Sequence, residues 1–235
     1  MLWFFSFLTG FISPLLWGLA GYVLVSRGQS PLVVLPLWIL FIFLDFMTIP
    51  GRAYYYYRKG LVRYAVVNLQ WYCFLTPGVQ KKLVAIGDLS WILMDLGLYN
   101  QAGYLLARAG DVVDSAPPSF SAALARYLLS QNTQPHVALV ITEAALAQGA
   151  GARTWLVRGI ALIRCQQPKS ALRALETARR AAVIKGDYIL NGTCYYYLGI
   201  AWKDLGRNNY AKDQLLKAEV LLDSLPLGSQ AARVL

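Results

Sequence analysis

The C-terminal part of the chain contains the same residue pattern twice, and this internal repeat constrains the fold more than any other feature. Six small or large apolar residues recur 40 residues later with unchanged spacing. They are Trp155, Gly159, Leu162, Ala171, Leu175 and Ala178 in the first copy, and Tyr195, Gly199, Trp202, Ala211, Leu215 and Ala218 in the second. Self-similarity at a period of about 20 to 50 residues indicates the stacked units of a solenoid.

Each copy reads as two helices separated by a break. Apolar residues recur at helical spacing on both sides of a short polar turn, at residues 166–168 in the first copy and 206–208 in the second. Where the two helices of a copy cross, only small side chains let the backbones approach. We therefore expect the packing contacts to involve the six small residues of the pattern, Gly159, Ala171, Ala178, Gly199, Ala211 and Ala218.

The same phase can be followed towards the N-terminus. The small residue that opens each second helix would be Ala65, Ala102, Ala138, Ala171 and Ala211, with spacings of 37, 36, 33 and 40 residues. The sequence thus predicts an all-α fold in which an α-solenoid of four to five helical hairpins occupies residues 83–235. The first, degenerate unit falls in residues 51–82, a basic and aromatic segment.

These units resemble tetratricopeptide repeats (TPR), helix-turn-helix modules of about 34 residues. The aromatic residue and the glycine of the family's first helix are matched in the two C-terminal copies by Trp155 with Gly159 and by Tyr195 with Gly199. Earlier units depart from the pattern, with Ile86 and Ala122 at the aromatic position, Ser90 and Arg126 at the glycine position, and a closing proline in register only as Pro77. The resemblance implies a fold, and no particular function comes with it.

The first fifty residues are nearly free of charge. Residues 2–25 carry no charged side chain and would form a helix of about 36 Å, while residues 32–49 carry one acid, Asp45, and would span about 27 Å. Since a bilayer core is about 30 Å thick, we expect residues 1–50 to form a transmembrane helical hairpin. A cleaved signal peptide fits the first run less well, because a basic n-region is missing and the apolar stretch is too long.

The formal net charge of +10 lies entirely after the second run. Between Gly51 and Lys82 there are six bases and no acid. Short flanks rich in Lys and Arg stay on the cytoplasmic side. We therefore expect an integral protein of an inner, plasma or thylakoid-type membrane, with the repeats and both termini on the cytoplasmic side. The three cysteines, which are widely spaced, suit a reducing compartment.

The start of the basic segment combines tyrosines with positive charge. Tyrosine suits the membrane interface, and bases beside it would meet anionic lipid headgroups. We expect the membrane interface to include Arg52, Tyr54, Tyr55, Tyr56, Tyr57, Arg58 and Lys59. Two interpretations of residues 61–75 remain, a helix of the first repeat or an amphipathic helix lying in the plane of the membrane.

Repeat solenoids bind partners on the concave surface lined by their first helices. In this chain that surface would be aromatic and basic, and would suit a protein partner with apolar anchors and some negative charge. Taken singly, each of its bases is equally well explained as a solvated surface residue. The expected partner-binding residues are Trp91, Met94, Tyr127, Arg153, Ile160, Arg164, Tyr196, Ile200 and Lys203.

Nothing in the sequence assembles a catalytic, cofactor, metal or nucleic-acid site. The only histidine is His136, beside Pro135, and no HExxH, GxSxG, phosphate-loop or GxGxxG motif occurs. Cys73, Cys165 and Cys194 form no CxxC pair. From Leu83 to Leu235 there are 15 bases against 11 acids, too small an excess for a nucleic-acid footprint.

The sequence therefore favours a non-enzymatic, membrane-anchored scaffold or assembly factor that binds a protein client through the concave face. An alternative is a stable accessory subunit of a larger membrane complex, such as a photosynthetic, respiratory or secretion complex. A third hypothesis is a transport or enzymatic role around Asp45, because an acid within a membrane span is costly. Asp45 lies four residues before the end of the run, about 6 Å from the boundary.

Overall fold

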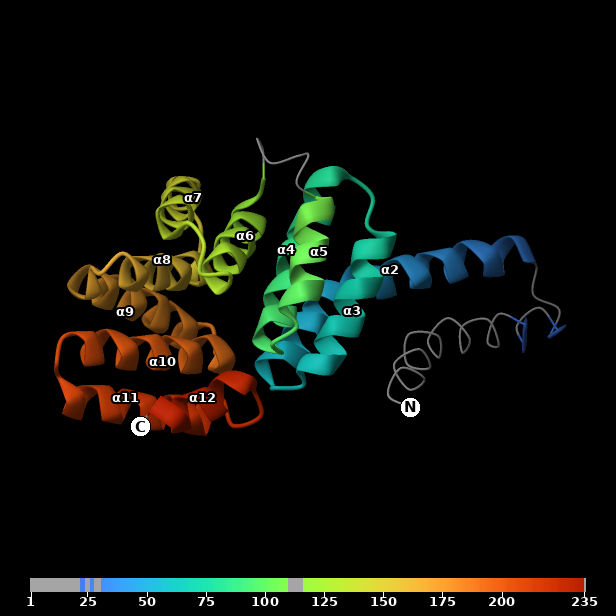
Figure 1. Ribbon diagram of the computed structural model, residues 1–235. Helices are drawn as coiled ribbons and strands as arrows, with labels where there is room; N and C mark the ends of the chain where they lie inside the picture. The colour runs from blue at the N-terminus through green and yellow to red at the C-terminus, as the bar shows by residue number, and fades with distance from the viewer. Residues whose placement is uncertain (1–21, 24–25, 28–30, 110–115, 235) are drawn as a thin grey trace.

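The computed structural model describes residues 22–23, 26–27, 31–109 and 116–234, and its regular structure there is helical throughout (Figure 1). The helices from α2 to α12 follow one another with short connections. They are α2 (Pro31–Arg58), α3 (Val62–Leu75), α4 (Val79–Asp95), α5 (Tyr99–Arg108), α6 (Pro118–Ser130), α7 (Pro135–Ala147), α8 (Ala152–Arg164), α9 (Pro168–Ile184), α10 (Tyr188–Asp204), α11 (Asn208–Leu221) and α12 (Pro226–Val234).

Consecutive helices pack as hairpins, and the hairpins stack into a solenoid. The pairs are α2 with α3, α4 with α5, α6 with α7, α8 with α9, and α10 with α11, while α12 packs on the last pair. The residue expected to open each second helix is buried in all five pairs, since Ala65, Ala102, Ala138 and Ala171 are 0% exposed and Ala211 is 3% exposed. The all-α solenoid expected from the repeat phase is therefore present.

The turns inside the two C-terminal hairpins fall at the predicted residues 166–168 and 206–208, and two earlier hairpins turn in the same way. Gly60, Gly97 and Gly206 follow a first helix with φ between +70° and +76°, and Gln166 takes the same left-handed conformation with φ +58°. Only glycine adopts this region without a steric penalty. In three of these turns the chain thus reverses at a residue suited to end a helix.

The tightest crossing within a hairpin involves a leucine. A Cβ built on Gly159 would lie 2.6 Å from the side chain of Leu175, and one built on Gly199 would lie 2.6 Å from Leu215. The sequence led us to expect that small residues, Gly159 and Ala171 among them, make the packing contacts at this crossing. Leu175 lies one turn further along α9, so the glycine accommodates the leucine side chain, and the alanine is buried nearby.

Helix α2 is continuous from Pro31 to Arg58, and its last turns belong to the solenoid. Ala53 is 0% exposed and Tyr57 is 1% exposed. Helix α3 runs back along α2 and buries Val62, Ala65 and Leu69. Residues 62–75 therefore pack as the second helix of a hairpin whose first helix is the end of α2.

Within the part of the chain that the structure describes, no helix has both the length and the hydropathy needed to span a bilayer. Of the predicted transmembrane hairpin, residues 2–25 lie outside the described residues except for Tyr22 and Val23. The backbone of residues 32–49 forms the N-terminal two thirds of α2.

The solenoid curves until its last units reach its first. Helix α10 contacts α2. A Cβ built on Gly97, in the turn between α4 and α5, would lie 3.6 Å from the Pro226 ring at the start of α12. Figure 1 shows α10 and α12 to the lower left of the α4–α5 hairpin. The last repeat and α12 therefore lie against the first two hairpins.

Candidate functional site on the inner face

The first helices α4, α6, α8 and α10 face the inside of the solenoid, where the end of α2 joins them. Aromatic and charged side chains from these helices form what we call the inner cluster. Its members are Tyr54, Tyr57, Asp88, Trp91, Asp95, Arg126 and Arg153. Hydrogen-bonded partners within the cluster lie up to 65 residues apart in the sequence.

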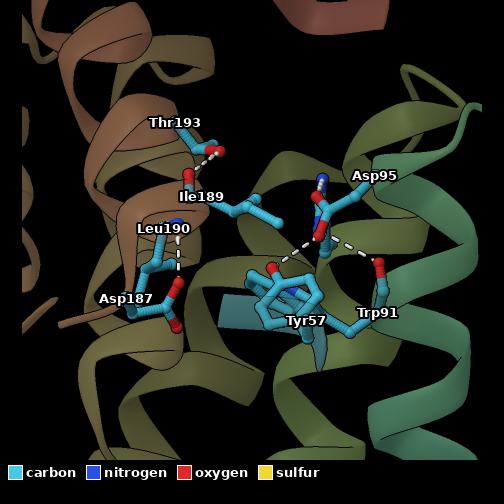
Figure 2. Close-up of polar contacts among 8 residues, drawn as sticks. Tyr57, Trp91, Asp95, Asp187, Ile189, Leu190 and Thr193 are labelled. Atoms are coloured by element: carbon cyan, nitrogen blue, oxygen red, sulfur yellow. Dashed lines mark hydrogen bonds and ion pairs between the residues drawn. The ribbon is translucent and has the colours of Figure 1, made fainter. Parts of the chain in front are cut away.

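Asp95 joins three helices in this cluster. Its carboxylate accepts a hydrogen bond from the Tyr57 hydroxyl on α2 at 2.7 Å and another from the Arg126 guanidinium on α6 at 2.6 Å. Arg126 also donates to the Trp91 carbonyl at 3.4 Å, and its guanidinium lies 4.4 Å from the centre of the Trp91 ring. Figure 2 shows Tyr57 and Asp95 pointing towards one another beside Trp91.

The guanidinium of Arg153 lies among three aromatic rings of the cluster. Its guanidinium pairs with Asp88 at 2.5 Å and lies 5.1 Å from the Trp91 ring, 5.4 Å from the Tyr54 ring and 5.6 Å from the Tyr57 ring. Burial lowers the pKa of Arg153, but Tyr54 and Asp88 outweigh burial and raise this pKa above its usual value. Arg153 therefore stays charged, with its charge shared between a carboxylate and three rings.

Asp187 lies at the start of α10, beside the inner cluster. Its carboxylate accepts a hydrogen bond from the Leu190 backbone N–H at 3.0 Å, which caps the helix (Figure 2). Burial raises the pKa of Asp187 above its usual value, although the Leu190 hydrogen bond and Arg153 act in the opposite direction. The carboxylate is thus costly to keep charged, even though it caps a helix.

The ion pairs of the inner cluster hold helices together. Asp88 and Asp95 are each paired with a guanidinium, so their charges are compensated within the protein. In the described part of the chain, no three His, Cys, Asp or Glu side chains converge as a metal site would require. Breaking a buried ion pair leaves an uncompensated charge. These contacts therefore fix how α2 sits against α4, α6 and α8.

The residues expected on the concave face divide into three groups. Arg164 and Lys203 are exposed, and Tyr127, Arg153, Tyr196 and Ile200 are half-buried. The structure buries the other three, Trp91, Met94 and Ile160, so they offer a partner almost no surface. Arg153 belongs to the inner cluster. The remaining accessible residues, which we call the open inner face, are Tyr127, Arg164, Tyr196, Ile200 and Lys203.

Two members of the open inner face lie near one another on neighbouring repeats. Burial raises the pKa of Tyr196, and the charge of Arg164 acts in the opposite direction. Tyr196 is on α10 and Arg164 is at the end of α8. The half-buried ring and the exposed guanidinium together offer an aromatic surface with a positive charge, which suits an apolar and acidic partner.

The tyrosine-rich end of α2 is largely directed into the protein. Tyr57 is buried, Arg52, Tyr54, Tyr56 and Arg58 are half-buried, and Tyr55 and Lys59 are exposed. The packing residues Gly159, Ala171, Ala178, Gly199, Ala211 and Ala218 are all buried. The side chain of Asp45, the centre of the third hypothesis, lies outside those that the structure describes.

Sequence reasoning missed the inner cluster, but one of its residues, Arg126, and the neighbouring Ser90 were visible as departures from the repeat. Arg126 stands where the later units have glycine, and Ser90, at the same position of the previous unit, is fully buried beside Trp91. A base at a position that packs helices together signals a buried partner of opposite charge. The partner, Asp95, could not be identified because it lies on another repeat.

Comparison with known proteins adds little to this description. No protein-family model matches the sequence, and no curated protein does. Among solved structures, MamA residues 41 to the end from Desulfovibrio magneticus RS-1 aligns with 18% identity and a TM-score of 0.41, covering 76% of this chain and 96% of that chain. A kinesin light chain with nearly identical TPR-like repeats from Podosopora anserina aligns with 18% identity and a TM-score of 0.42, covering 75% and 94%. Likenesses this loose carry no argument, so the description of the fold rests on the helix packing given above.

Proposed function

We propose that this protein is a non-enzymatic scaffold or assembly factor that holds a protein client at a membrane surface. The client binds the open inner face, and α2 with the apolar residues before it holds the solenoid at the bilayer. The membrane is of the inner, plasma or thylakoid type, with the repeats and both termini on the cytoplasmic side.

The observation that carries this proposal is the continuity of α2. One helix runs from an apolar N-terminal half into the solenoid core, with Tyr57 tied to Asp95. Large apolar side chains in the first two thirds of α2 are exposed: Leu35 is 59% exposed, Ile39 56% and Met47 51%. Such a row of exposed apolar residues is unfavourable in water and requires lipid or a protein partner.

The open inner face supports a protein client. It combines a half-buried tyrosine and isoleucine with the exposed bases Arg164 and Lys203. Interfaces gain most of their affinity from a few aromatic or arginine residues at a sheltered centre. We place such a centre at the half-buried ring of Tyr196, with the exposed Arg164 beside it.

A second candidate, a stable accessory subunit of a larger membrane complex, is favoured by the same exposed row on α2. Helices of other subunits would cover Leu35, Ile39 and Met47 as effectively as lipid does. The two candidates differ in how many copies of the partner remain bound.

Purification of the full chain from its own cells in mild detergent tests both candidates. For a scaffold or assembly factor we expect substoichiometric protein clients, and for a subunit a stoichiometric partner set. The double variant Arg164→Glu, Lys203→Glu should lose the partner under either candidate. The matched control Lys169→Glu, Lys212→Glu, at exposed positions on the second helices, should keep it. Equal recovery with both double variants would contradict binding at the open inner face.

A further inference from the structure

The end of α3 and the start of α4 carry apolar side chains that the described protein leaves about half or more exposed. Phe74 is 78% exposed, Leu75 48% and Val79 57%. The lysines that follow in the first turn of α4, Lys81 and Lys82, are also exposed. We call these five residues the α3–α4 corner. Contiguous apolar side chains rimmed by one sign of charge usually mark a contact with a partner or a membrane.

The packing of α3 on α2 places this corner at the level of the apolar run. The rings of Tyr56 and Tyr64 are 5.7 Å apart, which fixes the register of the antiparallel pair. Eleven residues further along α3 is Leu75, and eleven residues back along α2 is residue 45. Since both helices rise about 1.5 Å per residue, the corner lies level with the end of residues 32–49. Figure 1 shows α3 alongside α2 where α2 leaves the solenoid.

The charge of this region matches an anionic surface. No acidic residue occurs between Asp45 and Asp88. Arg63, Lys81 and Lys82 are exposed, and no described acid is paired with them. Bases next to exposed apolar side chains bind bilayers that contain anionic lipid, because the charges meet the headgroups while the apolar groups enter the interface.

We propose that the α3–α4 corner is a second membrane contact, which inserts Phe74, Leu75 and Val79 into the interface of an anionic bilayer. This inference rests on the anchor proposed above. The anchor by itself leaves the solenoid free to tilt against the bilayer surface. A second contact beside α2 removes that freedom, and it determines which side of the solenoid, and so of the open inner face, is turned to the bilayer.

A fluorescent label at the corner tests the contact in the full chain. Burial raises the pKa of the Cys73 thiol to about 12 and also raises that of Cys194, so at neutral pH neither thiol is a reactive thiolate. In a Cys165→Ser background, Phe74→Cys then provides one labelling site for an environment-sensitive dye. The parent without Phe74→Cys reports the residual labelling.

The labelled protein is reconstituted into vesicles of phosphatidylcholine, alone or in equimolar mixture with phosphatidylglycerol. Lipids with a spin label near the headgroup quench a dye that enters the interface. The matched control is Val140→Cys on α7, which is 65% exposed and lies in a different repeat. We expect severalfold stronger quenching at position 74 than at position 140, most of all with phosphatidylglycerol. Lys81→Glu with Lys82→Glu should remove the effect of the anionic lipid.

The outcomes separate this inference from the proposed anchor. If the chain enters the vesicles but positions 74 and 140 are quenched equally, the corner does not contact the bilayer, and the anchor stands. If the chain stays out of the vesicles, the anchor fails and the second contact fails with it. Quenching at position 74 that does not respond to the lysine substitutions would contradict the role of charge.

Discussion

Tyr57 illustrates how single side chains join the N-terminal helix to the solenoid. The run of four tyrosines at residues 54–57 suggests an interfacial belt, but in a helix successive residues point in directions about 100° apart. Tyr55 is therefore exposed, while the hydroxyl of Tyr57 reaches Asp95. Consecutive tyrosines thus lie in two environments, the surface and the protein interior. Only the packing of α2 against α4 decides which tyrosine faces inward.

Removing the Tyr57 hydroxyl should destabilise the fold. Tyr57→Phe deletes a hydrogen bond to the buried carboxylate of Asp95, and hydrogen bonds to charged groups contribute about 1.5 to 3 kcal/mol. We expect a loss of that size in the free energy of unfolding, measured by urea denaturation in detergent. Tyr55→Phe, at a position 58% exposed, is the control and should change stability by less than about 0.5 kcal/mol. Equal stability of the two variants would contradict the role of the Tyr57–Asp95 bond.

Asp187 should make stability depend on pH in a particular direction. Burial raises its pKa in the folded state. A raised carboxyl pKa contributes stability that is present below the unfolded pKa and is lost as pH rises through the folded value. Asp187→Asn keeps a cap acceptor for the Leu190 N–H without the buried charge. We therefore expect this variant to be at least as stable as the natural protein at neutral pH, with its advantage shrinking as pH falls below the folded pKa.

The control for this prediction removes the cap together with the charge. Asp187→Ala should lower stability by about 1 kcal/mol, because the Leu190 N–H loses its acceptor. Urea titrations at several pH values compare the three proteins. If Asp187→Asn were as destabilising at neutral pH as Asp187→Ala, the carboxylate would be stabilising in its charged form.

At the scale of helices, the hairpins were predictable because their causes are local. The turn at Gly206 and the alanine at Ala211 lie within one repeat, and their spacing recurs along the chain. The contacts between repeats were not predictable in this way. Tyr57 and Asp95 are 38 residues apart, and nothing in the repeat pattern pairs them. The contact of α10 with α2 depends on the curvature of the whole solenoid, and α12 lies beyond the last repeated position.

The approach of α4 to α6 leaves no room for a side chain at one glycine. A Cβ built on Gly87 would lie 2.7 Å from the Phe120 Cα, and backbone atoms cannot move aside as a side-chain tip can. We expect Gly87→Ala to lower stability by about 1 to 3 kcal/mol. Gly51→Ala, where a Cβ would meet nothing within 4 Å, should leave stability unchanged or raise it by up to about 1 kcal/mol. Thermal unfolding of both variants makes the comparison, and an unchanged Tm for Gly87→Ala would contradict the close packing of α4 on α6.

At the scale of the whole molecule, the proposed function depends on how the solenoid is oriented on the membrane as well as on its attachment to the membrane. Helix α2 continues without interruption into the solenoid, so a bilayer that holds its N-terminal half, together with the second contact proposed at the α3–α4 corner, orients the open inner face. The exposed apolar row on α2 and the α3–α4 corner lie at the same end of the first hairpin. The scaffold that we propose presents its client at a fixed angle to the membrane.

Interrupting α2 should separate orientation from attachment. A flexible Gly-Ser insertion of about seven residues, two helical turns, between Thr48 and Ile49 lies before the buried turns at Ala53 and Tyr57. We expect the solenoid to keep its stability while client recovery in mild detergent falls. An alanine-rich insertion of the same length continues the helix and should restore recovery. Full recovery with the flexible insertion would mean that α2 is only a tether.

The central claim, a protein client bound at the open inner face of a membrane-held solenoid, is tested most directly by photocrosslinking in intact cells. A photoreactive residue at position 203 on α10 is compared with one at position 212 on α11, both of which are exposed. We predict that position 203 alone gives an adduct of discrete mass with a second protein. We also predict that the protein stays in the membrane fraction after alkaline extraction. Release of the protein by alkaline extraction, or the same adducts from both positions, would contradict the claim.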